Sequence, residues 1–392
     1  MASGVRNGGT RAFDPSGCQG RDVGSPVCRA CGTDAGQVVL DLGAQPASDY
    51  FPPQRDLGPD PVYPLQMWLC ASCGLAQLVA DPTLPEEPRG REPEALIEQA
   101  AEAVARIAES GWLSGKETVA EFGSPHGGSW LALLAGRGLR PVGEDERADI
   151  VVDSFGMMHA ADQAGALSSR IARVAPGGAL FLQYHSLETI GRCGQWNALR
   201  HGHFAYYSAT ALSAMLRSTG FSPRMAWRFD LYGGTVLLAA TRDADVPGPP
   251  DRSVETVLLG EELAGVRDPA FLGSLERAAE CSAAGLRSWL LSAREAGRRV
   301  VGYGAASRAV ALLVRAGVNR DLLPAVADAA PAKHGLRMPG TDIPIIDPAE
   351  VLTFHPDAVL LFLPDLLGEV QRALPEVEAS GAVWVDAEAL GT

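Results

Sequence analysis

Hydrophobic residues repeat with two different periods along most of the chain. Residues 94–112 carry apolar side chains at helical spacing, and apolar runs of strand length follow at 118–122 and 150–153. Helical stretches separate these runs, and the same alternation returns beyond residue 283. Strands that alternate with helices are typical of α/β folds with parallel sheets, so we expect that class of fold.

The strand predicted at 118–122 leads directly into a glycine-rich segment. This segment reads Gly123-Ser-Pro-His-Gly-Gly128, and a helical stretch follows at 130–134. A strand, a glycine loop and a helix in this order let the backbone approach a cofactor at the start of the helix. Further on, a helix at 163–174, a Pro-Gly-Gly turn and a strand at 179–183 resemble the later part of a class I methyltransferase sheet.

The middle of the chain is short for a complete sheet of this kind. Only 26 residues separate Gly123 from Ile150, and they must hold a loop, a helix and a strand near 141–143. A full doubly wound half needs a further crossover of about a dozen residues or more. We therefore expect the middle domain to lack about one βα unit, which in the methyltransferases that it resembles helps to wall the adenine pocket.

A second α/β unit closes the chain. A helix at 283–296 and a strand at 299–303 lead into a loop that contains Gly302, Tyr303, Gly304, Ser307 and Arg308. The next strand ends in Asp328, close to where a ribose-binding acid stands in dinucleotide folds. Later strands at 358–362 and 383–386 complete a predicted Rossmann-like domain. Lys333 either brings a cation to a phosphate or is a solvated surface lysine.

Four cysteines fall into two CxxC pairs, each followed directly by glycine: Cys28, Cys31, Cys70 and Cys73. Two such knuckles supply the four thiolates that structural zinc prefers, and they leave no position for substrate or water. The 38 residues between the pairs leave room for a small β unit. The alternatives are a redox CxxC, which normally stands alone after a strand, and four unrelated buried thiols.

Composition excludes several classes of function. The net charge of −14 disfavours nucleic acid and anionic membranes, since both attract clustered basic residues. No apolar run reaches the roughly 18 residues of a membrane helix, and the N-terminal residues lack an apolar segment, so we expect a cytoplasmic protein. We expect four parts: a disordered tail (1–24), a zinc module (25–90), a methyltransferase-like domain (91–245) and a C-terminal domain (246–392).

Residues 184–208 concentrate three histidines and three tyrosines between two apolar runs. Imidazole titrates near neutral pH, so this segment suits the wall of an active site. His201 and His203 flank Gly202, which allows both rings to face one cleft. The alternative is a surface loop with stacked aromatic rings.

Several motifs together resemble one family, the zinc-containing sugar C-methyltransferases that act on nucleotide-linked keto sugars in deoxysugar biosynthesis. The likeness covers nearly the whole chain after the tail. Its motifs are the CRACG and CASCG knuckles, Tyr63-Pro64-Leu65, the EFGSPHGG loop, APGG, His-x-His-x-x-Tyr, Gly233-Gly234, GYGAASR, ADAAPAKHG and MPGTDIPI.

The resemblance implies a mechanism and a set of site residues. A base removes the proton beside the ketone of a dTDP-linked keto sugar, and the enolate attacks the methyl group of S-adenosylmethionine. The implied catalytic residues are His203, which serves as the base, His201 and Tyr206. Cofactor contacts are expected from Glu121, Gly123, Ser124, Gly127, Glu144 and Asp153. Substrate contacts are expected from Tyr63, Arg200, Gly302, Tyr303, Gly304, Ser307, Arg308, Asp328 and Lys333.

The chain also departs from the family pattern. The family's Tyr-His-Glu-His is Arg200-His201-Gly202-His203 here, and Pro125 and His126 stand inside the glycine loop where the family has asparagine and aspartate. Two enzyme hypotheses follow: a C-methyltransferase with a shortened cofactor pocket, or a relative that no longer uses S-adenosylmethionine and isomerises, eliminates or only binds. A non-catalytic zinc scaffold is the third hypothesis.

Overall fold

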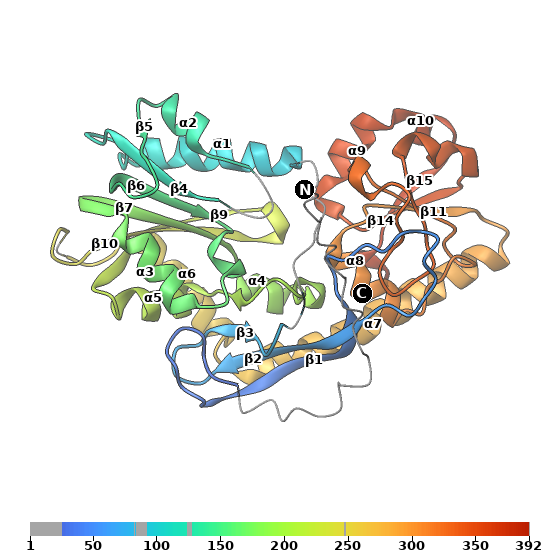
Figure 1. Ribbon diagram of the computed structural model, residues 1–392, viewed down its shortest axis with the longest axis horizontal. Coiled ribbons are helices and arrows are strands. Elements are labelled where there is room, and N and C mark those ends of the chain that lie inside the picture. The colour runs from blue at the N-terminus through green and yellow to red at the C-terminus, as the bar shows by residue number, and fades with distance from the viewer. Residues whose placement is uncertain (1–25, 82, 84–91, 124–127, 247, 392) are drawn as a thin grey trace, which may run out of the picture.

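The computed structural model describes residues 26–81, 83, 92–123, 128–246 and 248–391. Three sheets organise them, and Figure 1 shows two α/β domains side by side with a small antiparallel sheet along one side of both. The predicted tail (1–24) lies outside the described residues. Among the described helices, none combines the length and apolar character that crossing a lipid bilayer requires.

The N-terminal sheet is built from three antiparallel strands, β1 (Gly36–Pro46), β2 (Val62–Cys70) and β3 (Ala76–Leu78). A fourth strand, β8 (Ala205–Tyr206), comes from the middle domain and pairs with β3. Apolar side chains of β1 and β2, including Leu40, Leu65 and Met67, are buried. The predicted β unit between the CxxC pairs is therefore present, and it extends into the middle domain.

The middle domain contains a six-stranded sheet in the order β5-β4-β6-β7-β10-β9. Four strands run parallel to one another: β4 (Thr118–Phe122), β5 (Arg140–Pro141), β6 (Ala148–Ser154) and β7 (Val174–His185). Strand β10 (Thr235–Arg242) lies between β7 and β9 (Phe221–Phe229) and is antiparallel to both. The sheet is covered by helices α1 (Glu94–Glu109), α2 (Leu131–Ala135), α3 (Gln163–Ala172), α4 (Leu187–Arg192), α5 (Ala209–Arg217) and α6 (Arg252–Ala264).

The shortened edge of this sheet agrees with the expected loss of a βα unit. β5 has two residues, both exposed, and within the described part of the chain no strand pairs with its outer side. The Pro-Gly-Gly segment differs from expectation because it lies inside β7 rather than before it, with Gly177 at φ 71°. Glycine takes that backbone angle without a steric penalty, so the strand continues through the kink.

The C-terminal sheet is parallel, with the order β13-β12-β11-β14-β15. Its strands are β11 (Val300–Tyr303), β12 (Val326–Ala327), β13 (Ile345–Ile346), β14 (Ala358–Leu361) and β15 (Val383–Asp386), and its helices are α8 (Ser307–Arg315), α9 (Leu367–Ala373) and α10 (Pro375–Ala379). β11 pairs with β12 on one side and with β14 on the other. The strand order therefore reverses at β11, and the loop after it lies where α/β sheets bind ligands.

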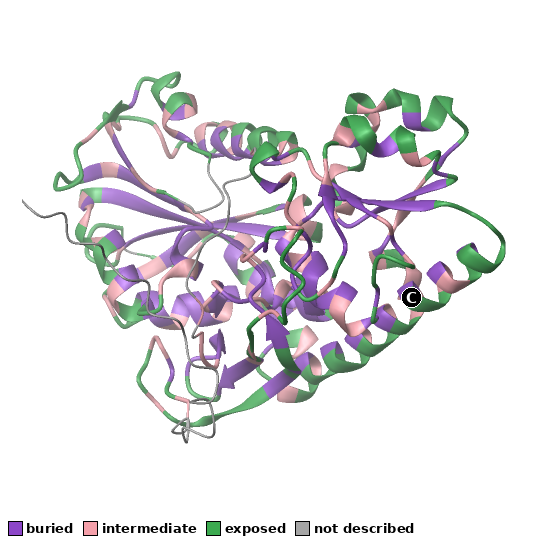
Figure 2. Cartoon of the chain, turned by 45° about the vertical axis from the view of Figure 1, so that its right-hand side comes forward, coloured by how far each residue is buried: buried purple, intermediate pink, exposed green. Residues whose placement is uncertain are grey.

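A long helix connects the N-terminal sheet with the C-terminal domain. Helix α7 (Pro269–Glu295) starts well before the predicted residue 283 because Asp268 caps it and proline occupies its first position. Its buried face includes Leu272, Leu275 and Leu286, which join β1, β2 and α8 in one hydrophobic core. Figure 2 shows this buried stripe along the helix. The zinc module is consequently packed against the C-terminal domain rather than tethered beside it.

Candidate active site

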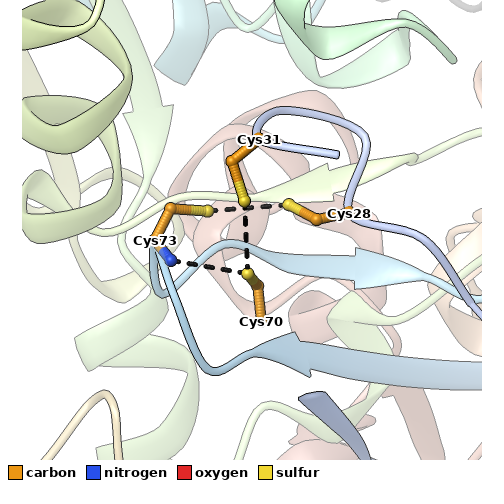
Figure 3. A group of neighbouring side chains, drawn as sticks. All are labelled: Cys28, Cys31, Cys70 and Cys73. Carbon is orange, nitrogen blue, oxygen red and sulfur yellow. Dashed lines mark hydrogen bonds between the residues drawn. The ribbon is translucent and has the colours of Figure 1, made fainter. Parts of the chain in front are cut away.

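The four cysteines converge on one point, as Figure 3 shows. Their sulfur atoms all lie within 4.8 Å of one another, and two sulfur pairs, Cys28 with Cys73 and Cys31 with Cys70, are 3.6 Å apart. A tetrahedral zinc ion with Zn–S bonds of about 2.3 Å needs sulfur atoms about 3.8 Å apart. The donor set therefore fits a zinc ion with four protein ligands, and its role is structural.

The zinc knuckle supports the segment that carries the candidate catalytic residues. The Arg29 backbone N–H donates to Gln77 on β3, and the Arg29 guanidinium donates to the carbonyl of Ala161 and lies 4.9 Å from the centroid of the Phe204 ring. Phe204 stands between His203 and β8. The first CxxC loop thereby contacts the segment that presents His203 and Tyr206.

A cavity of about 890 Å³ lies between the middle and C-terminal domains. One wall comes from the segment around β8 and from the carboxyl ends of β4, β6 and β7; the other comes from the loops after β11 and β12 and from α9. The predicted residues that line it are Gly123, Arg200, His203, Tyr206, Tyr303, Gly304, Ser307, Arg308, Asp328 and Lys333. Parts of the sequence about one hundred residues apart thus share one site.

Arg200 lies at the centre of the contacts between the two walls. Its Nε donates to His203 Nε2 at 2.9 Å, and its Nη1 donates to Ser307 Oγ at 3.0 Å across the cavity. Its backbone N–H donates to the Tyr206 hydroxyl at 3.1 Å. Because guanidinium has no acceptor, Nε2 of His203 is the nitrogen with the lone pair, and the imidazole is neutral with its proton on Nδ1.

The other predicted catalytic residues have different surroundings. His201 is 1% exposed, its Nε2 lies 3.4 Å from the carbonyl oxygen of Pro64, and its ring stacks edge-on against Tyr63. Burial lowers the pKa of His201 and raises the pKa of Tyr206. His201 and Tyr63 are absent from the cavity lining and pack toward the zinc module. A third imidazole, His159, contacts the His203 ring, and burial together with Arg200 lowers its pKa to about 4.

The C-terminal wall is suited to an anionic group. Helix α8 begins at Ser307 without a side-chain cap, so its first N–H groups face the cavity loop, and Arg308 stands beside them. Lys333 is 5% exposed and donates to the carbonyl of Ala305 at 2.8 Å, so the alternative of a solvated lysine does not hold. Burial is the main cause that raises the pKa of Tyr303 to about 12, and the negative charge of Asp328 adds to it. Asp328 directly follows β12.

Gly302 and Gly304, at the end of β11, are positions where the backbone requires glycine. A Cβ atom on Gly302 would lie 2.8 Å from a Val326 methyl group, so only glycine fits beneath the sheet edge. Gly304 adopts φ 93°, which turns the chain from β11 toward α8. Gly302 does not itself line the cavity.

The predicted cofactor residues fit S-adenosylmethionine only in part. Gly123 lines the cavity at the carboxyl end of β4, and the exposed Glu144 follows β5. Glu121 already accepts hydrogen bonds from Ser129 and the Trp130 N–H at the start of α2. Asp153 is 1% exposed, with one oxygen paired to Arg170 at 2.7 Å and the other bonded to backbone N–H groups. Ser124 and Gly127 lie outside the described residues.

Several cavity residues were not predicted individually, although the segment 184–208 was. Tyr184 and His185 end β7, Gln195 follows α4, and Tyr232 lies beside the Gly233-Gly234 motif with φ 57°. The available signal was the position of Tyr184 and His185 at the carboxyl end of a parallel strand, where sites in α/β folds collect. Gln195 and Tyr232 carry no comparable signal.

Three family models match the chain in order. The zinc-binding domain model covers residues 28–83, the methyltransferase domain model covers 92–224, and the C-methyltransferase C-terminal domain model covers 230–387. These matches support a methyltransferase that carries a zinc-binding domain before its methyltransferase domain and a C-methyltransferase C-terminal domain after it. The chain is 25% identical over 383 residues to the C-methyltransferase NovU of Streptomyces niveus. The matched region covers 87% of this chain and 90% of NovU.

Solved structures resemble only part of the chain, and only slightly. Magnesium protoporphyrin IX methyltransferase ChlM from Synechocystis PCC 6803 is 14% identical over 38% of this chain and 84% of that chain, with a TM-score of 0.28. N-methyltransferase NodS from Bradyrhizobium japonicum WM9 is 14% identical over 38% of this chain and 88% of that chain, also with a TM-score of 0.28. Similarity this slight says nothing about function.

Proposed function

We propose that the protein transfers a methyl group to a carbon atom beside the ketone of a nucleotide-linked sugar. The observation that carries this proposal is the shared cavity, in which His203 and the start of α8 form opposite walls joined by Arg200 and Ser307. A cavity of about 890 Å³ is within the range of ligand sites, and its two walls supply the two chemistries that such a substrate needs.

The C-terminal wall binds the nucleotide half of the substrate. The uncapped N–H groups of α8, with Arg308 and Arg200 nearby, favour a diphosphate, since helix N-termini and guanidinium groups both stabilise anions. Asp328 directly follows β12, which supports a role for its carboxylate in binding the ribose. The sugar then extends toward the middle domain and His203.

His203 removes the proton beside the ketone. Its Nε2 carries the lone pair, and Arg200 donates to that lone pair in the present arrangement. Arg200 must therefore move off Nε2 before the proton can be taken up there. A negatively charged substrate group gives the guanidinium an alternative partner, which couples substrate binding to release of the base.

S-adenosylmethionine supplies an electrophilic methyl group when bound. Two of the expected contacts support this proposal by their position in the sheet: Gly123 lines the cavity at the carboxyl end of β4, and the exposed Glu144 follows β5 outside the cavity lining. Asp153 is excluded from this set because both of its carboxylate oxygens already have partners in the protein.

Calorimetry with S-adenosylmethionine and S-adenosylhomocysteine tests the methyl-transfer proposal. We expect both to bind, and we expect a TDP-linked 4-keto-6-deoxysugar to become methylated at carbon. The two-residue β5 and the occupied Asp153 favour a second candidate, a reaction on the same sugar without S-adenosylmethionine. A folded protein that binds the sugar nucleotide but neither cofactor form would establish that second candidate instead.

A further inference from the structure

The turn that carries His203 is fixed by side chains from two other parts of the chain. Gly202, directly before His203, adopts φ 82°, a backbone angle that glycine reaches without strain. Its N–H donates to Oδ2 of Asp81 at 2.5 Å, and its carbonyl oxygen accepts from Nδ1 of His159 at 2.9 Å. Both backbone polar groups of the residue before His203 are therefore bonded to side chains that lie far away in the sequence.

Asp81 has a fixed position of its own. It follows β3, the strand of the N-terminal sheet that pairs with β8. Its other oxygen, Oδ1, accepts from the backbone N–H of Thr83 at 3.0 Å and from the Thr83 hydroxyl at 2.5 Å. Because both carboxylate oxygens have partners, the side chain keeps one orientation. The Gly202 N–H is thus bonded to a group whose place is set by the zinc module.

We propose that Asp81 is a positioning residue for the proposed base: by accepting the Gly202 N–H, it sets the direction in which the turn presents His203 to the cavity. The inference rests on the proposed function, because it takes His203 as the base. Asp81 does not line the cavity, whereas His203 does. Its carboxylate therefore acts on the turn and not on the substrate.

The bond to Asp81 is stronger than two other contacts of the same turn. The His203 N–H lies 3.4 Å from the carbonyl oxygen of Arg200, and His201 Nε2 lies 3.4 Å from that of Pro64. The bond to Asp81 is shorter and involves a carboxylate, and such charge-assisted bonds are about twice as strong as neutral ones. Position matters for a base, since a misplacement of about 1 Å costs about 100-fold in rate.

The negative charge of Asp81 offers a second explanation, which a pair of variants separates from the hydrogen bond. Burial lowers the pKa of His201, and the charge of Asp81 acts against that shift, so the carboxylate is felt within the turn. Asp81→Asn removes the charge but keeps one acceptor oxygen for the Gly202 N–H. Asp81→Leu removes both the charge and the acceptor. A positioning role predicts that only the leucine variant loses activity.

The test measures kcat with a TDP-linked 4-keto-6-deoxysugar and calorimetric affinity for TDP, both on the zinc-loaded full chain. We expect Asp81→Leu to lower kcat about tenfold with unchanged TDP affinity, and Asp81→Asn to stay within about threefold of wild type. Exchange of the hydrogen beside the ketone with deuterated water reads the base step alone. This exchange should fall in Asp81→Leu by the same factor as kcat.

Asp41 supplies a matched control in the same sheet. It also accepts a glycine N–H, that of Gly43 at 2.8 Å, together with the Gln66 amide at 2.7 Å. Asp41→Leu therefore removes an equivalent bond at a different turn and should keep the wild-type kcat. Thr83→Val removes only the hydroxyl that orients Asp81 and should lower kcat in the same direction. This milder variant gives an independent reading if Asp81→Leu does not fold.

The outcomes separate this inference from the proposed function. Wild-type kcat in Asp81→Leu, or equal losses in Asp81→Leu and Asp81→Asn, would overturn the positioning role. A loss of TDP affinity as large as the loss of kcat would indicate a general structural role and overturn it as well. If wild type neither exchanges the hydrogen nor methylates the sugar, the proposed function fails together with the inference.

Discussion

Arg200 connects the two halves of the candidate active site through three hydrogen bonds, to His203, to Ser307 and to the Tyr206 hydroxyl. The family pattern that this chain resembles has tyrosine at the position of Arg200 and glutamate at the position of Gly202. The imidazole of His203 therefore has a guanidinium partner, which a tyrosine at position 200 could not supply. Arg200 is the group that must leave Nε2 before a proton can be taken up there.

His203→Gln should abolish turnover without abolishing substrate binding. The amide keeps polarity but cannot take up a proton, and loss of a general base costs about 10²- to 10⁴-fold in rate. The measurement is kcat with a TDP-linked keto sugar, alongside calorimetric affinity for TDP. His201→Gln is the matched comparison, since His201 faces Pro64 rather than the cavity, and its main effect should be on the melting temperature. Unchanged kcat in the His203 variant would rule out the base role.

Three buried imidazoles, His159, His185 and His201, should make stability depend on pH, because burial lowers the pKa of each. Burial lowers the pKa of His159 to about 4 and that of His185 to about 3, so between these values and about 6.5 the unfolded chain binds more protons than the folded one. The free energy of unfolding should therefore fall as pH decreases from 7 to 5. Each residue contributes up to about 1.4 kcal/mol per pH unit in that window.

His185→Phe should reduce this dependence, because it removes one of the three groups. Urea unfolding at pH 7 and pH 5, with zinc in excess, gives the difference. His355→Asn replaces an exposed histidine and should keep the wild-type slope. Identical slopes for wild type and the His185 variant would show that this imidazole does not titrate on unfolding.

One buried ion pair, between Arg170 and Asp153, links helix α3 to strand β6. Arg170 and Asp153 have side-chain exposures of 11% and 2%, and the guanidinium also lies over the Phe122 ring at 4.3 Å from its centroid. Both carboxylate oxygens are used, so the pair fixes the carboxyl end of β6. That edge borders the region where the cofactor is expected.

Arg170→Ala should destabilise the protein by about 3–5 kcal/mol, since it leaves Asp153 buried without a counter-charge. The control is Glu102→Ala, which breaks an exposed pair with Arg106 whose side chains are 49% and 42% exposed, and it should cost less than about 1 kcal/mol. Chemical denaturation measures both. Similar losses in the two variants would contradict the assigned role of the buried pair.

Several helices and strands lie where the hydrophobic periodicity predicts them. Strand β4 has the predicted bounds, and α3, β11 and β14 lie where the apolar runs are. The pairing of β8 with β3 was not predictable, because a two-residue strand has no period to recognise and its partner is more than one hundred residues away. This pairing brings Tyr206 into the site.

The three parts of the chain are held together by shared packing. Helix α7 and the N-terminal sheet form one core with the C-terminal domain, while α6 packs on β9 and α5 of the middle domain although it lies beyond residue 246. The domain boundaries expected from composition remain predictions. The shared core makes the zinc module part of the cavity's support.

Removal of zinc should therefore affect the site as well as the module. A chelator should lower the melting temperature and weaken TDP-glucose binding, since structural zinc contributes about 10 kcal/mol or more to its module and β3 carries β8. Cys31→Ser should act in the same way, and zinc analysis should find one ion per wild-type chain. Cys281→Ser, at a cysteine outside the cluster, is the matched control. A chelator without effect on melting would exclude a structural zinc.

Local chemistry was sufficient to assign the zinc ligands, the α/β class and the shortened middle sheet. Thiolate spacing, hydrophobic period and the number of residues available for a crossover are properties of neighbouring residues, so they can be read along the chain. The assignment of His201, Tyr63 and Asp153 needed the fold, because the direction of a side chain depends on what packs around it. Only tertiary contacts decide that Arg200 spans the cavity to Ser307 and that His203 lines the cavity while His201 does not.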